Sequence, residues 1–122
     1  FRRRYVWQLG ERLDVEAMRK GAVLLLGTHD FTSFCGNKHF KKSALRTIFD
    51  ISLTLSGGEL SIDYRGDGFL QNMIRIITGT LVEIGEGKKR PGDIPIILEA
   101  KDRAAAGFTA PPQGLTLVEV TY

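Results

Sequence analysis

Apolar and polar residues alternate along two neighbouring stretches of the chain, residues 47–55 and 60–64. Because successive side chains of a strand point to opposite faces, this spacing predicts two strands that each bury one face. The Gly57-Gly58 pair between them is typical of a tight reversal, so the strands are expected to form a hairpin. The expected apolar face of the first strand consists of Phe49, Ile51, Leu53 and Leu55.

A long apolar helix is predicted at residues 69–86, after a glycine-flanked turn. Ile76 and Val82 lie on its far side, together with Arg75. Unpaired burial of a charge is very costly, so Arg75 is expected to reach either water or an anionic partner. On spacing alone, a structural role is the commoner one for such an arginine. The expected core stripe of this helix consists of Leu70, Met73, Ile74, Ile77, Leu81 and Ile84.

The order of the predicted elements indicates an α+β fold, with an antiparallel sheet of about four strands and helices packed on one face. Asp14 offers a side-chain oxygen as N-cap of the first helix, which is expected to stop at Gly27. The other predicted elements are a strand at 5–9, a helix at 15–26, a loop at 28–43, a helix at 93–100 and a strand at 115–122.

Length and composition indicate one globular domain, residues 1–122, with 43% hydrophobic and 25% charged residues. No apolar run approaches the roughly 20 residues of a membrane span, and no secretory leader is visible. We therefore expect no membrane partner and a cytoplasmic location. A single cysteine, Cys35, suits a reducing compartment, and its spacing from His29 and His39 matches no zinc site.

Basic residues gather in clusters, although the formal net charge is only +3. One cluster alone is ordinarily a solvated loop, whereas three favour contact with the phosphate backbone of RNA. The first cluster opens the chain at residues 2–4. The residues assigned to RNA binding are Lys38, Lys41, Lys42, Lys88, Lys89 and Arg90.

Other polar residues are expected to have local roles. Asp30 and Ser33, in the sequence HDFTSF, are typical of side chains that hydrogen-bond turn backbone. Phe31 and Phe34 are expected to anchor that loop in the core. The charge run at residues 101–103 is expected to cap a helix end and brace a loop.

Three motifs in the chain resemble a known family. GTHDFTSF at 27–34, GDGFLQNMIRIITGTLVEIGEGK at 66–88 and EAKDRAAAGFTAPPQGLTLVEVTY at 99–122 together resemble the C-terminal half of the tRNA pseudouridine synthase A family. The resemblance runs from about residue 3 to residue 122. It implies an isomerase that converts uridine to pseudouridine in the tRNA anticodon stem-loop, with a catalytic aspartate and no metal or organic cofactor.

The resemblance also implies which pocket residues are here and which are not. The family's aspartate lies in an Arg-Thr-Asp-x-Gly-Val motif that this chain lacks, and Tyr5-Val6-Trp7 fits a later strand better than the family's pocket tyrosine motif. Arg75 matches the arginine that pairs with the catalytic carboxylate, and Leu115 matches the apolar residue that packs against the flipped base. Asn72 is assigned to the same substrate pocket.

We therefore expect the C-terminal half of an enzyme, inactive by itself, whose partners are tRNA, the missing N-terminal half and a second copy in a homodimer. The start at Phe1 rather than methionine agrees with this expectation. The alternatives are a stand-alone, non-catalytic RNA-binding module and a plain interaction domain. Self-association of the fragment is expected through an apolar patch of Ile76, Val82, Leu115 and Leu117.

Overall fold

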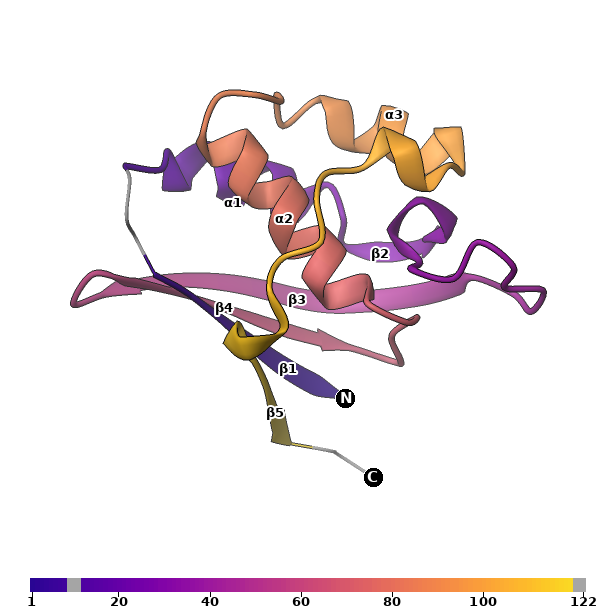
Figure 1. Ribbon diagram of the computed structural model, residues 1–122, viewed down its shortest axis with the longest axis horizontal. Helices are drawn as coiled ribbons and strands as arrows, with labels where there is room; N and C mark the ends of the chain where they lie inside the picture. Colours follow the sequence, from indigo (N-terminus) through magenta and orange to yellow (C-terminus); the bar gives the residue numbers. More distant parts are fainter. Residues whose placement is uncertain (9–11, 120–122) are drawn as a thin grey trace.

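The computed structural model describes residues 1–8 and 12–119, except for the side chains of residues 116–119. A five-stranded antiparallel sheet with the order β2-β3-β4-β1-β5 forms one layer, and the helices cover one of its faces (Figure 1). One continuous apolar core fills the space between the two layers. The elements are β1 (Arg2–Gln8), α1 (Val15–Val23), β2 (Gly27–Asp30), β3 (Leu45–Ser56), β4 (Glu59–Gly66), α2 (Met73–Gly85), α3 (Asp93–Ala100) and β5 (Leu115–Glu119), with short 3-10 turns η1 (Thr32–Phe34), η2 (Arg103–Ala105) and η3 (Pro112–Gly114).

The predicted α+β class is confirmed. The sheet has one strand more than the predicted four, because the edge strand β2 lies largely in a segment that was predicted to be a loop. In β2, Gly27 pairs with Ile48 and Asp30 pairs with Leu45. This strand is short and lies at the sheet edge, so its polar residues carry no alternating pattern that predicts a strand. The expected final strand is described as far as Glu119, and residues 120–122 lie outside the described part of the chain.

Strand β3 contains an irregularity that the alternation pattern did not predict. Its register with β4 shifts between Ile48 and Asp50, which inserts Phe49 and reverses the side-chain parity there. Ile48 is therefore buried, whereas Phe49 lies on the outer face, 49% exposed, with the Arg65 guanidinium 5.3 Å from its ring centroid. The expected burial of Leu53 is confirmed, while Leu55, near the strand end, is half exposed.

Helix α2 is buried on both sides, so the predicted apolar patch on its far side was wrong. Every residue of the expected stripe is buried, but Ile76 and Val82 are buried as well. Residues 106–114, which we call the strap, cross over α2 before β5 begins (Figure 1). They approach so closely that a Cβ on Gly79 would lie 1.8 Å from the carbonyl oxygen of Phe108. Those side chains thus offer no surface for self-association.

The boundaries of the helices follow from their caps. Asp14 accepts a hydrogen bond from the Ala17 amide at 3.0 Å, as expected for the N-cap of α1. Helix α2 begins at Met73, four residues later than predicted, because Asn72 adopts a left-handed conformation with φ of 58°. No helix in the described part of the chain is long and apolar enough to span a membrane.

Candidate functional site at the start of helix α2

Two neutral oxygen atoms hold the guanidinium of Arg75 at the N-terminal end of α2. Its Nε donates to the carbonyl oxygen of Ala110 at 2.7 Å, and its Nη1 donates to the side-chain oxygen of Asn72 at 3.1 Å. Among the described residues no carboxylate forms an ion pair with Arg75, and its Nη2 has no hydrogen-bond partner there. The half-buried cation therefore has donors that no described carboxylate occupies.

The strap is positioned on Arg75 by the main chain as well. The Ala110 amide donates to the Arg75 carbonyl oxygen at 3.0 Å, so backbone and side chain of Arg75 both contact Ala110. This pairing fixes the strap where it enters the site.

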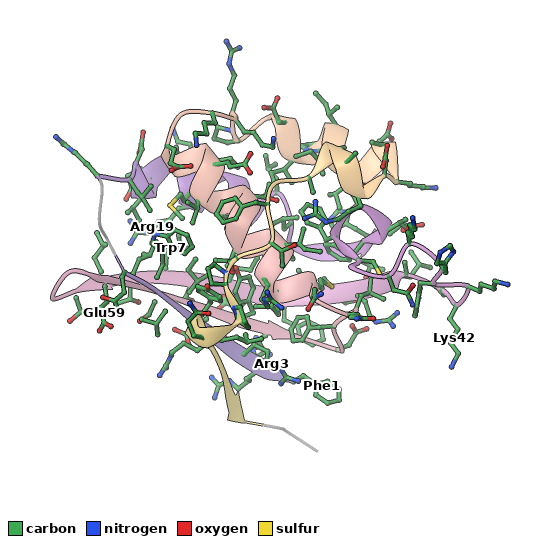
Figure 2. All side chains as sticks on the ribbon, viewed as in Figure 1. Phe1, Arg3, Trp7, Arg19, Lys42 and Glu59 are labelled. Atoms are coloured by element: carbon green, nitrogen blue, oxygen red, sulfur yellow. The ribbon has the colours of Figure 1, made fainter. Side chains whose placement is uncertain are left out.

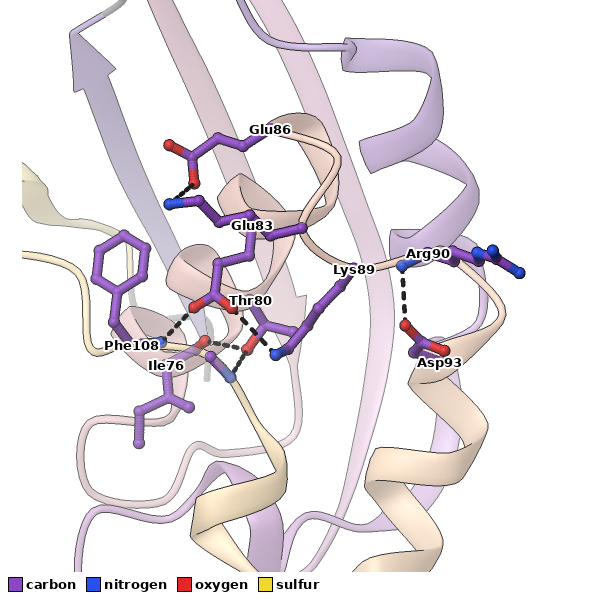
Figure 3. Close-up of polar contacts among 10 residues, drawn as sticks. Ile76, Thr80, Glu83, Glu86, Lys89, Arg90, Asp93 and Phe108 are labelled. Carbon is purple, nitrogen blue, oxygen red and sulfur yellow. Dashed lines mark hydrogen bonds and ion pairs between the residues drawn. The ribbon is translucent and has the colours of Figure 1, made fainter.

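Further along α2, two side chains attach the strap to the helix (Figure 3). Glu83 accepts hydrogen bonds from the Phe108 amide at 2.9 Å and forms an ion pair with Lys89 at 3.0 Å. Thr80 accepts from the Gly107 amide at 2.9 Å and donates to the Ile76 carbonyl oxygen at 2.8 Å. The strap is thus held at two successive turns of α2 before it reaches Arg75.

Tyr5 on β1 connects the strap to the start of β5. Its hydroxyl donates to the carbonyl oxygen of Pro111 at 2.5 Å, and its backbone is paired with Leu115 in the sheet. Burial raises the pKa of Tyr5 above its ordinary value, and the positive charge of Arg75 partly opposes that rise. Leu115 is half-buried and packs against the core, so its predicted outward projection was wrong. The side chain of Leu117 lies outside the described part of the chain.

The loop that follows η1 packs against the same end of α2. The Gly36 amide donates to the carbonyl oxygen of Gln71 at 2.8 Å. A Cβ on Gly36 would lie 2.8 Å from the side-chain nitrogen of Asn72, so no larger residue fits there without displacing Asn72. The loop carrying the first lysine cluster therefore touches the residue that holds Arg75.

A cavity of about 1230 Å³ opens beside this contact. Lys38 and Lys42 line it from the loop, and Lys101 with Arg103 line it from the turn after α3. Lys41 is exposed and is not part of the cavity wall. In Figure 2, Lys42 extends from the end of the molecule opposite Glu59.

The second lysine cluster lies elsewhere and has internal partners. Lys88 pairs with Glu86 at 3.4 Å, and Lys89 pairs with Glu83 as described above. The Arg90 amide donates to Asp93 at 2.9 Å. Helix α2 has 13 residues and spans about 20 Å, so this cluster sits a helix length from Arg75. The structure does not bring it to the site.

The polar residues expected to have local roles do have them. Asp30 accepts hydrogen bonds from the amide and hydroxyl of Thr32, and chiefly the hydroxyl contact lowers the pKa of Asp30. The Ser33 hydroxyl donates to the Ile97 carbonyl oxygen and accepts from the Asp102 amide, which joins η1 to the end of α3. Phe31 and Phe34, flanking them, are fully buried.

Acidic groups near α2 have other partners. Asp67 lies in the turn before α2, and its carboxylate accepts a hydrogen bond from the Thr47 amide at 2.9 Å. In the described ranges no group of three or more His, Cys, Asp or Glu side chains is arranged to hold a metal ion. Among the described residues, the start of α2 therefore brings together the Arg75 cation and its two neutral acceptors.

The sequence predicted a site that includes Arg75 and Asn72, and the structure places these two side chains in hydrogen-bond contact. The residues that surround them were not predicted. Tyr5 had only strand alternation as its signal, and the strap has no periodic pattern that predicts its path over α2. Lys101 and Arg103 were assigned to capping and bracing, and Arg103 does donate to Thr109 at 3.0 Å. Their convergence with the lysine loop depends on contacts between segments far apart in sequence.

Comparison with known proteins gives consistent matches. The profile of a family described as tRNA pseudouridine synthase matches residues 22–122. A tRNA pseudouridine synthase A from Brevibacillus brevis is 49% identical over 122 residues, which is 100% of this chain and 50% of that protein. Counterparts from Halalkalibacterium halodurans and Geotalea uraniireducens are 53% and 48% identical, over 94% and 95% of this chain and 44% and 48% of their own lengths. The chain thus spans about half the length of the curated relatives it matches.

Proposed function

The chain belongs to the tRNA pseudouridine synthase family, and we propose that it is the C-terminal half of a synthase that isomerises uridine in the tRNA anticodon stem-loop. In this proposal the chain contributes RNA-binding surface and part of the uridine pocket. The catalytic aspartate comes from an N-terminal half, since this chain has no Arg-Thr-Asp motif. The complete enzyme needs no metal or organic cofactor and acts as a cytoplasmic homodimer.

The observation that carries the proposal is the state of Arg75. It is half-buried, it is oriented by two neutral acceptors, and it has no carboxylate partner among the described residues. An aspartate brought next to its remaining donors would be held in the ionised form, because a nearby positive charge lowers a carboxyl pKa. Arg75 is therefore proposed to keep the catalytic aspartate charged and oriented.

The neighbouring residues are proposed to shape the pocket. Leu115 offers apolar surface at the start of β5, suited to pack against a uracil ring that has left its stack. Asn72 orients Arg75 through its side-chain oxygen, and its left-handed backbone holds that oxygen in place. Tyr5 fixes the strap that carries the Arg75 acceptor.

The test is Arg75→Ala in the complete enzyme, with unmodified tRNA as substrate and a pseudouridine-specific assay. Loss of a charge partner of the catalytic acid is expected to lower kcat roughly 100-fold or more. Arg12→Ala is the matched control, because Arg12 is exposed in the segment between β1 and α1 and has no assigned role in the pocket or in RNA binding. A normal rate for Arg75→Ala would assign Arg75 a structural role. Tight tRNA binding without any turnover by the unaltered complete protein would favour the non-catalytic RNA-binding alternative.

A further inference from the structure

The cavity of about 1230 Å³ beside the site is framed by segments far apart in sequence. One wall is the loop between η1 and β3, and the other is the turn between α3 and η2. The turn is held against η1 because Ser33 accepts from the Asp102 amide at 2.9 Å and donates to the Ile97 carbonyl oxygen at 2.6 Å. The position of the turn is therefore fixed by buried contacts rather than by chance proximity.

Positive charge predominates in the cavity wall. Its cations are Lys38, Lys42, Lys101 and Arg103, against the carboxylates of Asp30 and Asp102. None of these four cations forms an ion pair in the described part of the chain.

The two carboxylates are occupied by local turns and do not neutralise the lysines by direct contact. Asp30 binds the amide and hydroxyl of Thr32, and Asp102 accepts from the Ala104 amide. The ammonium groups therefore remain available to an anion from outside.

The cavity also adjoins the proposed uridine pocket. Gly36 belongs to the cavity wall, and its amide donates to the Gln71 carbonyl oxygen at 2.8 Å. Its α-carbon lies so close to Asn72 that an added Cβ would be 2.8 Å from the side-chain nitrogen. Asn72 in turn accepts a hydrogen bond from Arg75. Arg75, Asn72 and the cavity wall are therefore neighbours, and an RNA backbone that passes Asn72 on leaving the uridine pocket would reach the cavity.

We propose that this cavity binds phosphate groups of the substrate RNA next to the target nucleotide, with Lys38, Lys42, Lys101 and Arg103 as their ligands. The inference rests on the proposed function in taking RNA as the substrate. It adds a binding site that joins the lysine loop to the turn after α3. A ligand of this class is favoured because a row of unpaired cations on both walls of an open cavity suits a chain of phosphates.

The test measures binding of an unmodified tRNA transcript to the complete enzyme across a series of salt concentrations. The variants are Lys42→Gln and Lys101→Gln, singly and together, and Lys20→Gln is the matched control. All three lysines are exposed, and each single substitution removes one positive charge. The three single variants are therefore expected to have the same net charge and similar stability. Lys20 lies on α1, outside the cavity wall.

Each cavity variant is expected to raise the Kd several-fold at low salt and to flatten the plot of log Kd against log salt by about 0.7–0.9 per lost phosphate contact. The double variant is expected to lose about twice that slope. Lys20→Gln is expected to leave the slope unaltered. Equal effects of the control and the cavity variants, or no effect of either cavity variant, would overturn the proposal.

The outcome is separable from that of the proposed function. Binding slopes do not depend on turnover, so a change confined to the cavity variants supports the cavity even if the complete protein forms no pseudouridine. Conversely, Arg75→Ala could lose most of its kcat while the salt slopes of Lys42→Gln and Lys101→Gln stay unchanged. That result would support the proposed enzymatic function and contradict phosphate binding in the cavity.

Discussion

Arg75 illustrates what a single residue in this chain does and does not reveal from sequence. Its place on the far side of a periodic apolar stripe predicted a charge that needs a partner, and the structure gives it two neutral acceptors. The identity of those acceptors was not predictable, because Ala110 is 35 residues away along a segment without periodicity. The residue types therefore predicted that Arg75 requires a partner, whereas the path of the strap in the folded chain determines which atoms bind it.

Glu83 is expected to position the strap, and Glu83→Ala tests this at the residue scale. The substitution removes the acceptor of the Phe108 amide and the ionic partner of Lys89, in a side chain that is only 16% exposed. We expect the free energy of unfolding of the chain to fall by about 2 kcal/mol, measured by urea denaturation.

Glu86→Ala is the matched control for Glu83→Ala. Its pair with Lys88 lies at the surface, where ion pairs contribute little, so a change below about 0.5 kcal/mol is expected. In the complete enzyme Glu83→Ala is also expected to lower kcat, through displacement of Ala110. Stability equal to that of Glu86→Ala would show that the strap does not depend on Glu83.

At the scale of elements, periodicity predicted the long strands and helices, and the departures arose where neighbouring segments impose geometry. The bulge at Phe49 is invisible in the alternation of β3, since inserting one residue reverses the parity only on pairing with β4. Burial of Ile76 and Val82 likewise follows from the strap, not from α2 itself. Both corrections arise from contacts with a neighbouring segment, β4 for Phe49 and the strap for Ile76 and Val82. The apolar positions of α2 themselves were predicted correctly.

Gly79→Ala tests the fit between α2 and the strap. Glycine is needed at this position because a Cβ would lie 1.8 Å from the Phe108 carbonyl oxygen, and a backbone atom cannot yield as a flexible side chain does. We expect the free energy of unfolding to fall by about 3 kcal/mol through overpacking, measured by thermal and urea denaturation.

Gly92→Ala is the control, because a Cβ at Gly92 meets nothing within 4 Å and its φ of −65° suits alanine. It is expected to leave stability unchanged or to raise it by about 0.5 kcal/mol. Similar stability of Gly79→Ala and Gly92→Ala would mean that the strap lifts from α2 at little cost.

For the whole molecule, the sequence predicted the fold class well and the distribution of function only in part. The three basic clusters do not form one surface. The residues at 88–90 include two lysines paired with Glu83 and Glu86, whereas Lys38 and Lys42 share a cavity with basic residues from another segment. Linear clustering gives the number of charges but not their partners, and partners decide whether a charge is available to a ligand.

The last prediction concerns the division of the active site between two halves. The chain alone is expected to form no pseudouridine, since it carries no Arg-Thr-Asp motif and the Asp67 carboxylate is bound to the Thr47 amide. Mixed with a separately produced N-terminal half that is also inactive alone, it is expected to restore pseudouridine formation in unmodified tRNA. The Arg75→Ala form of the chain should bind that half but leave turnover at least 100-fold lower, because it lacks the cation proposed to orient the aspartate. Turnover by the chain alone would mean that an acid within these 122 residues performs the reaction.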